Sequence, residues 1–568
     1  MGGSLTMPAK ELQRRVAAIC GLAETSRVPK ITPSMFSSRA RCAGGLFVPP
    51  PLAALFLVLS LPSAAGAPVA EARVLVADAA SFEESASLAA ALHAELAGKS
   101  DPLSGLDSAE LAVLASFYGG RGDRAIWVDA SGLTPLGNIL RGRLGQTAAV
   151  AGADIGGLLQ ADSDRKQRTD ATSLAERELI LSTAFLRSAI DPLAPEAPAS
   201  GPQAMREIAD AADPRSALER YLPVDPAFWR LRSSLAAYRA LAELGAWPLV
   251  PEGPKLEMGD QDVRIAALAK RLSISGDLAA DAAISDHFDE ALDQAVRRFQ
   301  RRHGLAEDGV VGKATLAALN TPIETRLQTL SVNLARLLDP PREWGPRYIA
   351  VNLAAASYRL VDHGAPVFEQ VAIVGRPTWP TPRFDGLMTM LEFNPYWVVP
   401  PRIARLELWP KIHQDPGYLA RNDMHLVNGQ IRQDPGPKNP LGVVKFIFPN
   451  SYDVYLHDTN SPSLFGRVDR HLSHGCIRIP NARDLAIYLL QADAAWTADR
   501  VADAIASGRN LRVDLPRPIA VHLVYDTAWV DPDGTVEFRD DAYKQDALAN
   551  AAAERMAALT FSSCPTLR

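Results

Sequence analysis

The spacing of apolar residues changes along the chain, and this change constrains the fold more than any other feature. Between about residues 83 and 260 the chain is rich in Ala and Leu, with apolar residues at helical spacing, as at Leu231 and Leu235. From about residue 346, short β-type segments such as 348–353 are separated by Gly and Pro. The sequence therefore predicts a helical scaffold joined to a β-rich domain.

The composition is that of a soluble globular protein. The chain has 568 residues, 47% hydrophobic and 22% charged, a length that suggests three or four domains. Its formal net charge of −6 provides no overall basic surface for nucleic acid. Its 4 cysteines are too few for a disulfide scaffold or a multi-cysteine zinc array. We expect no cofactor and no metal.

Residues 1–72 have the order of charges and apolar residues typical of a signal peptide. Arg39 and Arg41 precede an apolar stretch at 46–61, and small residues follow it. The uninterrupted part, 52–61, is shorter than the ~20 residues that span a bilayer as a helix. The alternatives are an uncleaved inner-membrane anchor and a buried core helix. The rest of the chain is expected to be exported, with membrane contact only through this segment.

Two details of this segment stay open. A start at Met1 would give an unusually long charged region, whereas Met35 gives a normal one, so we predict Met35 as the true start. N-terminal sequencing of the precursor distinguishes the two. Cleavage is expected after Ala65 or Ala72. No cysteine follows the apolar stretch until Cys476, so a lipoprotein anchor is not expected.

Residues 262–322 form a separate helical unit. Leu292, Val296 and Phe299 share one face of a helix that is expected to end near Gly304. The pattern AVRRFQRRHGLAEDGVVGKATLAALN resembles the small three-helix peptidoglycan-binding domain, and the alternative is a generic helical hairpin. The arginines of this pattern are expected to form a solvated helix face rather than a nucleic-acid surface.

The residues that can carry chemistry are concentrated around Cys476. The segment Ser473-His474-Gly475-Cys476 places one imidazole near the thiol, and His457 must reach it from another strand or loop. A thiol becomes a strong nucleophile when an imidazole takes its proton. Backbone amides around Gly475 can form an oxyanion hole. Arg478 can hold a carboxylate or favour the thiolate.

Two other roles are open to Cys476. Export allows a disulfide with Cys564, although that residue lies in a segment expected to fray. The nearby histidines and the cysteine can also be zinc ligands, although no CxxC pair accompanies them. From the residues alone, Cys476 is a candidate nucleophile.

The order His457, Ser473-His474-Gly475-Cys476, Arg478 and Asn481 resembles the signature of the YkuD-type L,D-transpeptidases, cysteine enzymes of peptidoglycan. The resemblance extends through VGRPTWPTPRF, LEFNPYWVVP, RQDPGPKNPLG and KFIFPNSYDVYLHDT, and DRAIWVDASGLTP resembles the large Gram-negative branch. It implies a multi-domain α+β fold whose parts are a helical scaffold (83–260), a peptidoglycan-binding domain (262–322), a β-rich catalytic domain (346–540) with a polar, irregular inserted lid (about 401–440), and a C-terminal tail (541–568).

The resemblance also implies roles for the site residues. Cys476 would attack the carbonyl of the third residue of a tetrapeptide stem and expel the terminal D-Ala. His457 would be the general base that forms the thiolate and later helps to deprotonate the incoming amine, and the Gly475 and Cys476 amides would stabilise the oxyanion. A backbone carbonyl or Ser473 would orient an imidazole, and His474 would shape the pocket. The substrate-binding residues would be Arg478, Asn481 and Tyr455.

A second stem's amine would then resolve the thioester into a 3→3 cross-link in the periplasm. Water would instead give an L,D-carboxypeptidase, and a lipoprotein lysine would give wall anchoring. A non-catalytic wall-binding protein is disfavoured because both His457 and Cys476 are present. The expected partners are peptidoglycan stem peptides and cell-wall synthesis proteins. Carbapenem β-lactams are expected to acylate Cys476.

Overall fold

The computed structural model describes residues 70–98, 108–147, 155–190, 200–245, 247–282, 284–338, 342 and 344–549. Most of the predicted signal or anchor segment (1–72) lies outside these residues, as do Met35, Cys20, Cys42 and Cys564. Among the helices of this described part, none is both long and apolar enough to cross a membrane.

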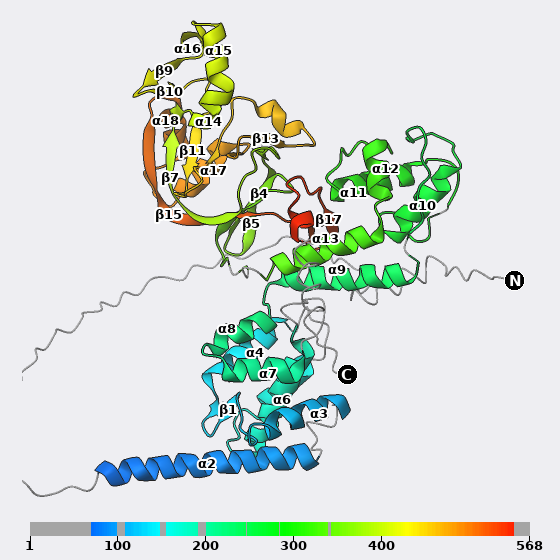
Figure 1. Cartoon of the computed structure of the whole chain (residues 1–568), viewed down its shortest axis with the longest axis vertical. Coiled ribbons are helices and arrows are strands. Elements are labelled where there is room, and N and C mark those ends of the chain that lie inside the picture. Colours follow the sequence, from blue (N-terminus) through cyan, green and yellow to red (C-terminus); the bar gives the residue numbers. More distant parts are fainter. Residues whose placement is uncertain are drawn as a thin grey trace, which may run out of the picture.

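A group of helices forms the N-terminal part of the described chain (Figure 1). Its elements are α2 (Ala70–Gly98), α3 (Ser108–Gly119), β1 (Val128–Asp129), β2 (Gly132–Leu133), α4 (Pro135–Thr147), α5 (Ile155–Asp164), α6 (Ala171–Ser188), α7 (Gly201–Asp210) and α8 (Pro214–Tyr221). The central helix α6 contacts α2, α4 and α5. Its buried Glu178 accepts hydrogen bonds from the Tyr118 hydroxyl and from the amides of residues 126–128. These bonds provide the partners that a buried carboxylate requires and tie the β1 region to α6.

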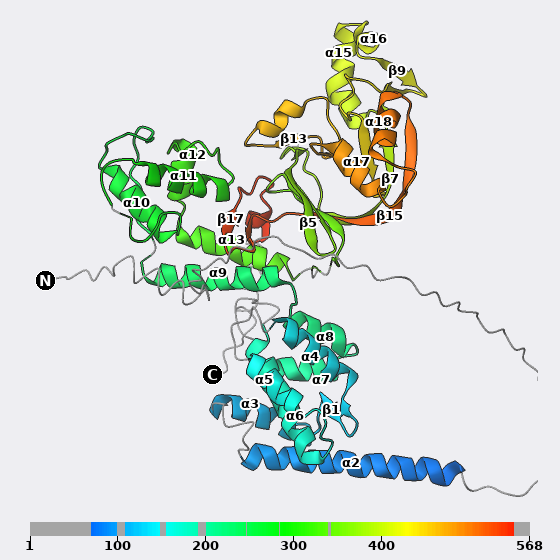
Figure 2. The ribbon, with the colours of Figure 1, turned by 180° about the vertical axis from the view of Figure 1, so that it is seen from behind.

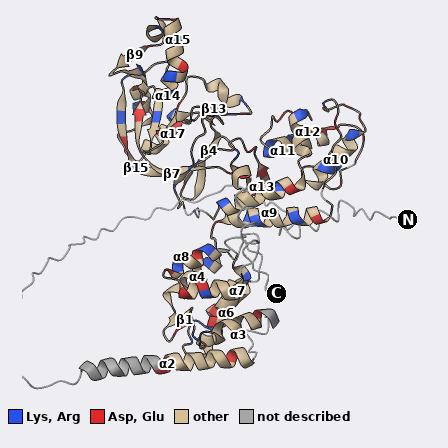
Figure 3. Cartoon of the chain, viewed as in Figure 1, with Lys and Arg blue, Asp and Glu red and all other residues tan. Residues whose placement is uncertain are grey.

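Helices α9 (Pro226–Glu243) and α13 (Ile323–Arg336) lie side by side between this group and the rest of the chain (Figures 1 and 2). They share an apolar cluster with the hairpin β16 (Ala528–Val530) and β17 (Val536–Phe538), including Trp229, Leu334 and Phe538. The predicted helical scaffold therefore contributes its last helix to a second packing cluster. Basic and acidic side chains are interspersed over the described elements (Figure 3).

The three-helix unit consists of α10 (Arg264–Ile274), α11 (Glu290–Arg302) and α12 (Lys313–Leu319) around Phe288 and Phe299. Helix α11 ends just before Gly304, whose φ of 64° is the left-handed geometry expected after a helix. Arg539 Nη1 donates to the Arg302 carbonyl at 3.1 Å, and the His303 and Phe538 rings stack 5.5 Å apart. The unit is thus docked on the β16–β17 hairpin.

An eight-stranded sheet, ordered β14-β12-β11-β7-β15-β3-β4-β5, forms the β-rich domain. Its strands are β3 (Tyr348–Asn352), β4 (Ser357–Asp362), β5 (Ala365–Val371), β7 (Phe384–Phe393), β11 (Val444–Ile447), β12 (Leu456–His457), β14 (Ile477–Arg478) and β15 (Leu511–Val524). Two pairs, β12 with β14 and β15 with β3, are parallel. Helices α17 (Ala482–Leu490) and α18 (Ala498–Ala506) join the sheet in one apolar core. Outside this sheet and the predicted lid, the domain also contains β6 (Val374–Gly375), β13 (His471–Ser473) and the 3₁₀ helix η3 (Pro462–Gly466). The predicted multi-domain α+β fold is confirmed.

The predicted lid is not an irregular loop. Its elements are α14 (Pro401–Ile403), the π-helix η2 (Ala404–Leu408), α15 (Trp409–Gln414), α16 (Tyr418–Arg421), β9 (Met424–Val427) and β10 (Gln430–Gln433), and β8 (Trp397–Val398), just before it, pairs with β10. Buried Leu408, Met424 and Ile431 belong to a small core of its own. Each element is too short to show an apolar period, which explains why the sequence pattern looked irregular.

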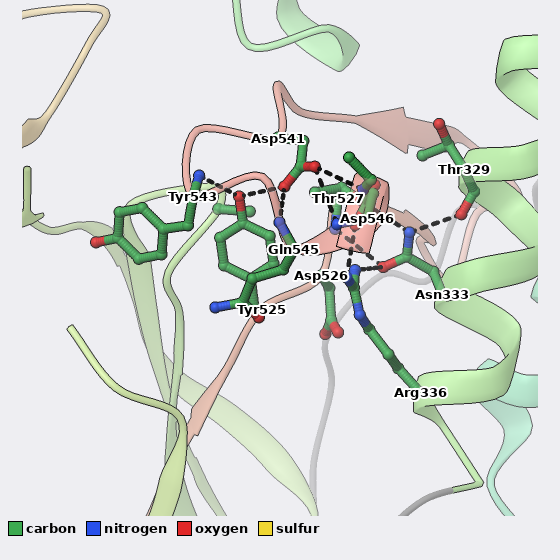
Figure 4. A network of polar contacts seen from close by, with 12 residues as sticks. Thr329, Asn333, Arg336, Tyr525, Asp526, Thr527, Asp541, Tyr543, Gln545 and Asp546 are labelled. Atoms are coloured by element: carbon green, nitrogen blue, oxygen red, sulfur yellow. Dashed lines mark hydrogen bonds and ion pairs between the residues drawn. The ribbon is translucent and has the colours of Figure 1, made fainter. Parts of the chain in front are cut away.

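Residues 541–549, within the predicted tail, are held in a polar network (Figure 4). Asp546 forms an ion pair with Arg336 Nη2 of α13 at 2.6 Å, and Thr527 Oγ1 donates to it at 2.5 Å. The Asp541 carboxylate accepts hydrogen bonds from the Tyr525 hydroxyl and from the amides of residues 545–547. The described part of the tail is therefore anchored to both α13 and the β-rich domain.

We predict that Asp546→Ala lowers the free energy of unfolding of the β-rich domain by about 3 kcal/mol, because it leaves the guanidinium of Arg336 buried without its carboxylate. Calorimetry of the purified chain measures the loss. The double variant Arg336→Met/Asp546→Ala should recover part of it. A single variant as stable as the wild type would contradict the importance of this pair.

Candidate active site

The parallel pairing of β12 with β14 positions the candidate nucleophile. Leu456 pairs with Ile477, and the Ile477 amide donates to the Tyr455 carbonyl at 3.1 Å. Leu456 and Ile477 are fully buried in the core. Because successive side chains alternate between the faces of a sheet, residues 455, 457, 476 and 478 lie on the opposite face. The register thus brings the predicted site residues Tyr455, His457, Cys476 and Arg478 together.

Polar residues continue across this face of the sheet. Lys445 on β11 pairs with His457, and Glu392 on β7 pairs with Lys445. The Lys445 ammonium lies 3.9 Å from the centre of the Tyr455 ring. Neither Lys445 nor Arg478 forms an ion pair within the described part of the chain. Sequence reasoning missed Lys445, although its alternation with buried Val444 and Phe446 indicates a strand with Lys445 on the other face.

Cys476 is a free, partly exposed thiol. Its Sγ donates to the Asp453 carbonyl over 3.7 Å. Burial raises the pKa of the Cys476 thiol, while hydrogen bonding from Tyr455 and the charges of Lys445 and Arg478 act in the opposite direction. The site therefore holds a protonated thiol at neutral pH, with two cations placed to stabilise the thiolate.

His457 lies on β12, beside the strand β14 that follows Cys476, and 3% of its surface is exposed. Burial, and then the charge of Arg478, lower the pKa of His457 to about 3. Hydrogen bonds to the Asp458 and Leu441 carbonyls raise this pKa but do not compensate for the burial. Its Nδ1 lies 2.5 Å from the Asp458 carbonyl oxygen, to which it donates. No hydrogen bond joins His457 to Cys476 Sγ among the described residues, and such catalytic bonds are often long before substrate binds.

The turn before Cys476 is held by Ser473. Its hydroxyl donates to the Cys476 carbonyl at 2.6 Å and accepts from the Gly475 amide at 3.1 Å. Ser473 therefore bonds to backbone in this structure rather than to an imidazole. The Gly475 amide, an expected oxyanion donor, is engaged, whereas the Cys476 amide has no hydrogen bond within the described residues. A Cβ on Gly475 would meet no atom within 4 Å, so its φ of +116° is what requires glycine.

A second layer of side chains supports this turn. Thr381 Oγ1 donates to the Gly475 carbonyl at 2.8 Å and accepts from the Gly375 amide at 2.9 Å. The Tyr543 hydroxyl donates to the Gly375 carbonyl at 2.5 Å. Sequence reasoning missed Thr381 and Tyr543, because long-range bonds to backbone leave no local pattern.

His474 faces the lid. Its Nε2 lies 2.6 Å from Glu407 Oε1 of η2, and the Trp379 ring packs edge-on against it at 4.9 Å. Sequence reasoning also missed Glu407, which lies far from the motif in the chain. Asn481, expected to bind substrate, begins α17 with a φ of 52°, and its carbonyl accepts from the Asp484 amide.

Two alternative roles of Cys476 are a disulfide and a zinc ligand. Cys564, the proposed disulfide partner, lies outside the described residues. Within those residues no group of three or more His, Cys, Asp or Glu side chains is arranged to hold a metal ion.

Three segments match known family models. Residues 346–513 match the L,D-transpeptidase catalytic domain (YkuD), residues 261–319 match the "Putative peptidoglycan binding domain", and residues 112–235 match the "Scaffold domain". A curated "Putative L,D-transpeptidase" from Haemophilus influenzae is 30% identical over 225 residues, which are 36% of this chain. The match spans 45% of that relative's length.

Solved structures of L,D-transpeptidases are also similar. One from Xylanimonas cellulosilytica is 19% identical, with 48% of this chain and 98% of that chain covered and a TM-score of 0.18. Another from Stackebrandtia nassauensis is 15% identical, with 50% and 98% covered and a TM-score of 0.21. The family matches thus identify a YkuD-type L,D-transpeptidase catalytic domain at residues 346–513 and a separate peptidoglycan-binding domain at residues 261–319.

Proposed function

We propose that the protein is a peptidoglycan L,D-transpeptidase that forms 3→3 cross-links through a thioester on Cys476. The proposal rests on the groups that surround the Cys476 thiol. Cys476 is partly exposed and lies beside the cations of Lys445 and Arg478. Among the described residues these cations have no ion-pair partner, and the Cys476 amide has no hydrogen bond. These are the parts that thiolate attack on an acyl group requires.

In the first half-reaction the Cys476 sulfur attacks the carbonyl of the third residue of a tetrapeptide stem. The thiol proton passes to His457, which is neutral at physiological pH and oriented by the Asp458 carbonyl. The carbon–nitrogen bond breaks, and D-Ala leaves as an amine with that proton. The Cys476 amide stabilises the oxyanion, and Lys445 and Arg478 attract the carboxylates of the stem.

In the second half-reaction the side-chain amine of another stem attacks the thioester. Attack by water would make an L,D-carboxypeptidase, and attack by a lipoprotein lysine would anchor that protein to the wall. Cross-linking is supported by the docked peptidoglycan-binding domain, which can hold the polymer that carries both stems. This activity would lie in the periplasm, with stem peptides and cell-wall synthesis proteins as partners.

We predict that Cys476→Ala abolishes acyl-enzyme formation and all products from a purified tetrapeptide substrate, because the attacking sulfur is gone. Mass spectrometry measures both, and a pull-down with intact peptidoglycan serves as the control. Wall binding through residues 262–322 should persist. Turnover by the variant would refute the nucleophile, and wild-type products without cross-linked dimer would refute transpeptidation.

The pH dependence of thiol reactivity gives a further prediction. Because the pKa of Cys476 is raised and that of His457 is lowered to about 3, the thiolate forms only as pH rises above the usual thiol value of about 8.5. Iodoacetamide alkylation of Cys476, followed by mass spectrometry from pH 5 to 10, should therefore reach half its maximum above pH 8.5.

The variant Lys445→Met should move this midpoint higher still, since it removes a charge that favours the thiolate. A plateau already reached below pH 7 would show a preformed thiolate–imidazolium pair and contradict this account.

A further inference from the structure

The lid supplies a carboxylate to His474. Glu407 Oε1 lies 2.6 Å from His474 Nε2, and Arg376 Nη2 donates to the same oxygen at 3.0 Å. Both members of the pair are partly exposed, 24% for the His474 side chain and 34% for Glu407. The pair can therefore be reached by a substrate, unlike the buried His457.

This pairing fixes the form of the His474 imidazole. Burial alone would raise the pKa of Glu407, but hydrogen bonds from His474 and Arg376 outweigh it and hold the pKa below its usual value. An ionised carboxylate only accepts, so Nε2 carries the proton and the Nδ1 lone pair is left to take another. In the described part of the chain Nδ1 has no hydrogen-bond partner. A carboxylate that holds one imidazole nitrogen is the arrangement that makes the other a general base.

His457 is less suited to act on the incoming amine. The residue is 3% exposed, so an incoming amine reaches it less readily than it reaches the His474 side chain, which is 24% exposed. An amine that attacks a thioester must lose a proton to a base within its reach.

We propose that His474, positioned by Glu407 of the lid, is the general base of the acceptor half-reaction, while His457 serves the donor half-reaction. The inference rests on the proposed function. The acceptor nitrogen bonds to the thioester carbon as one of its protons passes to His474 Nδ1. The carbon–sulfur bond then breaks, and His474 returns that proton to the Cys476 sulfur.

The lid thereby becomes part of the catalytic machinery. Glu407 is placed by the π-helix η2, in which the Trp409 amide bonds to the Ala404 carbonyl one residue farther back than in an α-helix. Such turns often occur at functional sites. The base for the acceptor is complete only when η2 lies against His474, so the position of the lid sets when an amine can be activated.

The test separates the two half-reactions in the full chain. A tetrapeptide whose side-chain amine is acetylated can act only as donor, and its acyl-enzyme is followed by intact-protein mass spectrometry. A second tetrapeptide with a free amine then discharges the acyl-enzyme. Glu407→Gln should slow this discharge at least tenfold and His474→Gln about 100-fold, in the range typical of general acid–base catalysis. Acylation should slow less than twofold in both variants.

The matched control is Asp434→Asn, which breaks another histidine–carboxylate pair of the same lid, His425 Nε2 to Asp434 at 2.8 Å. It should leave both rates unchanged. Equal slowing of both half-reactions by Glu407→Gln would mean that Glu407 only holds the lid, and no slowing of discharge would also overturn the inference. A wild-type chain that is never acylated would overturn the proposed function itself.

Discussion

The pairing of β12 with β14 is the constraint on which the site depends. Two residues of each strand form the ladder, and burial of Leu456 and Ile477 sets its register. A shift of one residue would turn Cys476 into the core and expose Ile477, at a cost of about 2 kcal/mol for that side chain alone. The core therefore fixes where the thiol lies, and the turn bonded by Ser473 and Thr381 fixes its backbone.

The positive charges around the thiol lower the stability of the fold unless an anion is present. Lys445 and Arg478 are partly buried cations without ion pairs in the described residues, an arrangement that costs solvation free energy. Burial lowers the pKa of both side chains. An anion at Cys476 or a substrate carboxylate, the negative charge that the proposed reaction forms or binds, would offset that cost.

Much of the fold and the central residues could be predicted from the sequence, because local patterns encode them. The helical periodicity, the end of α11 near Gly304 and the motif around Cys476 are all short-range features. The contributions of Glu407, Thr381 and Tyr543 could not be predicted, since each reaches the site from a distant segment. The lid was mistaken for an irregular loop because its core is assembled from elements too short to show a period.

The central claim is that Cys476 carries the donor stem as a thioester. Peptide mapping by mass spectrometry of the full chain, quenched in acid after mixing with the acetylated tetrapeptide donor, tests it most directly. The account predicts one adduct, the donor stem without its terminal D-Ala, on the peptide that contains Cys476. Release of D-Ala with no adduct on that peptide, or an adduct on another residue, would contradict it.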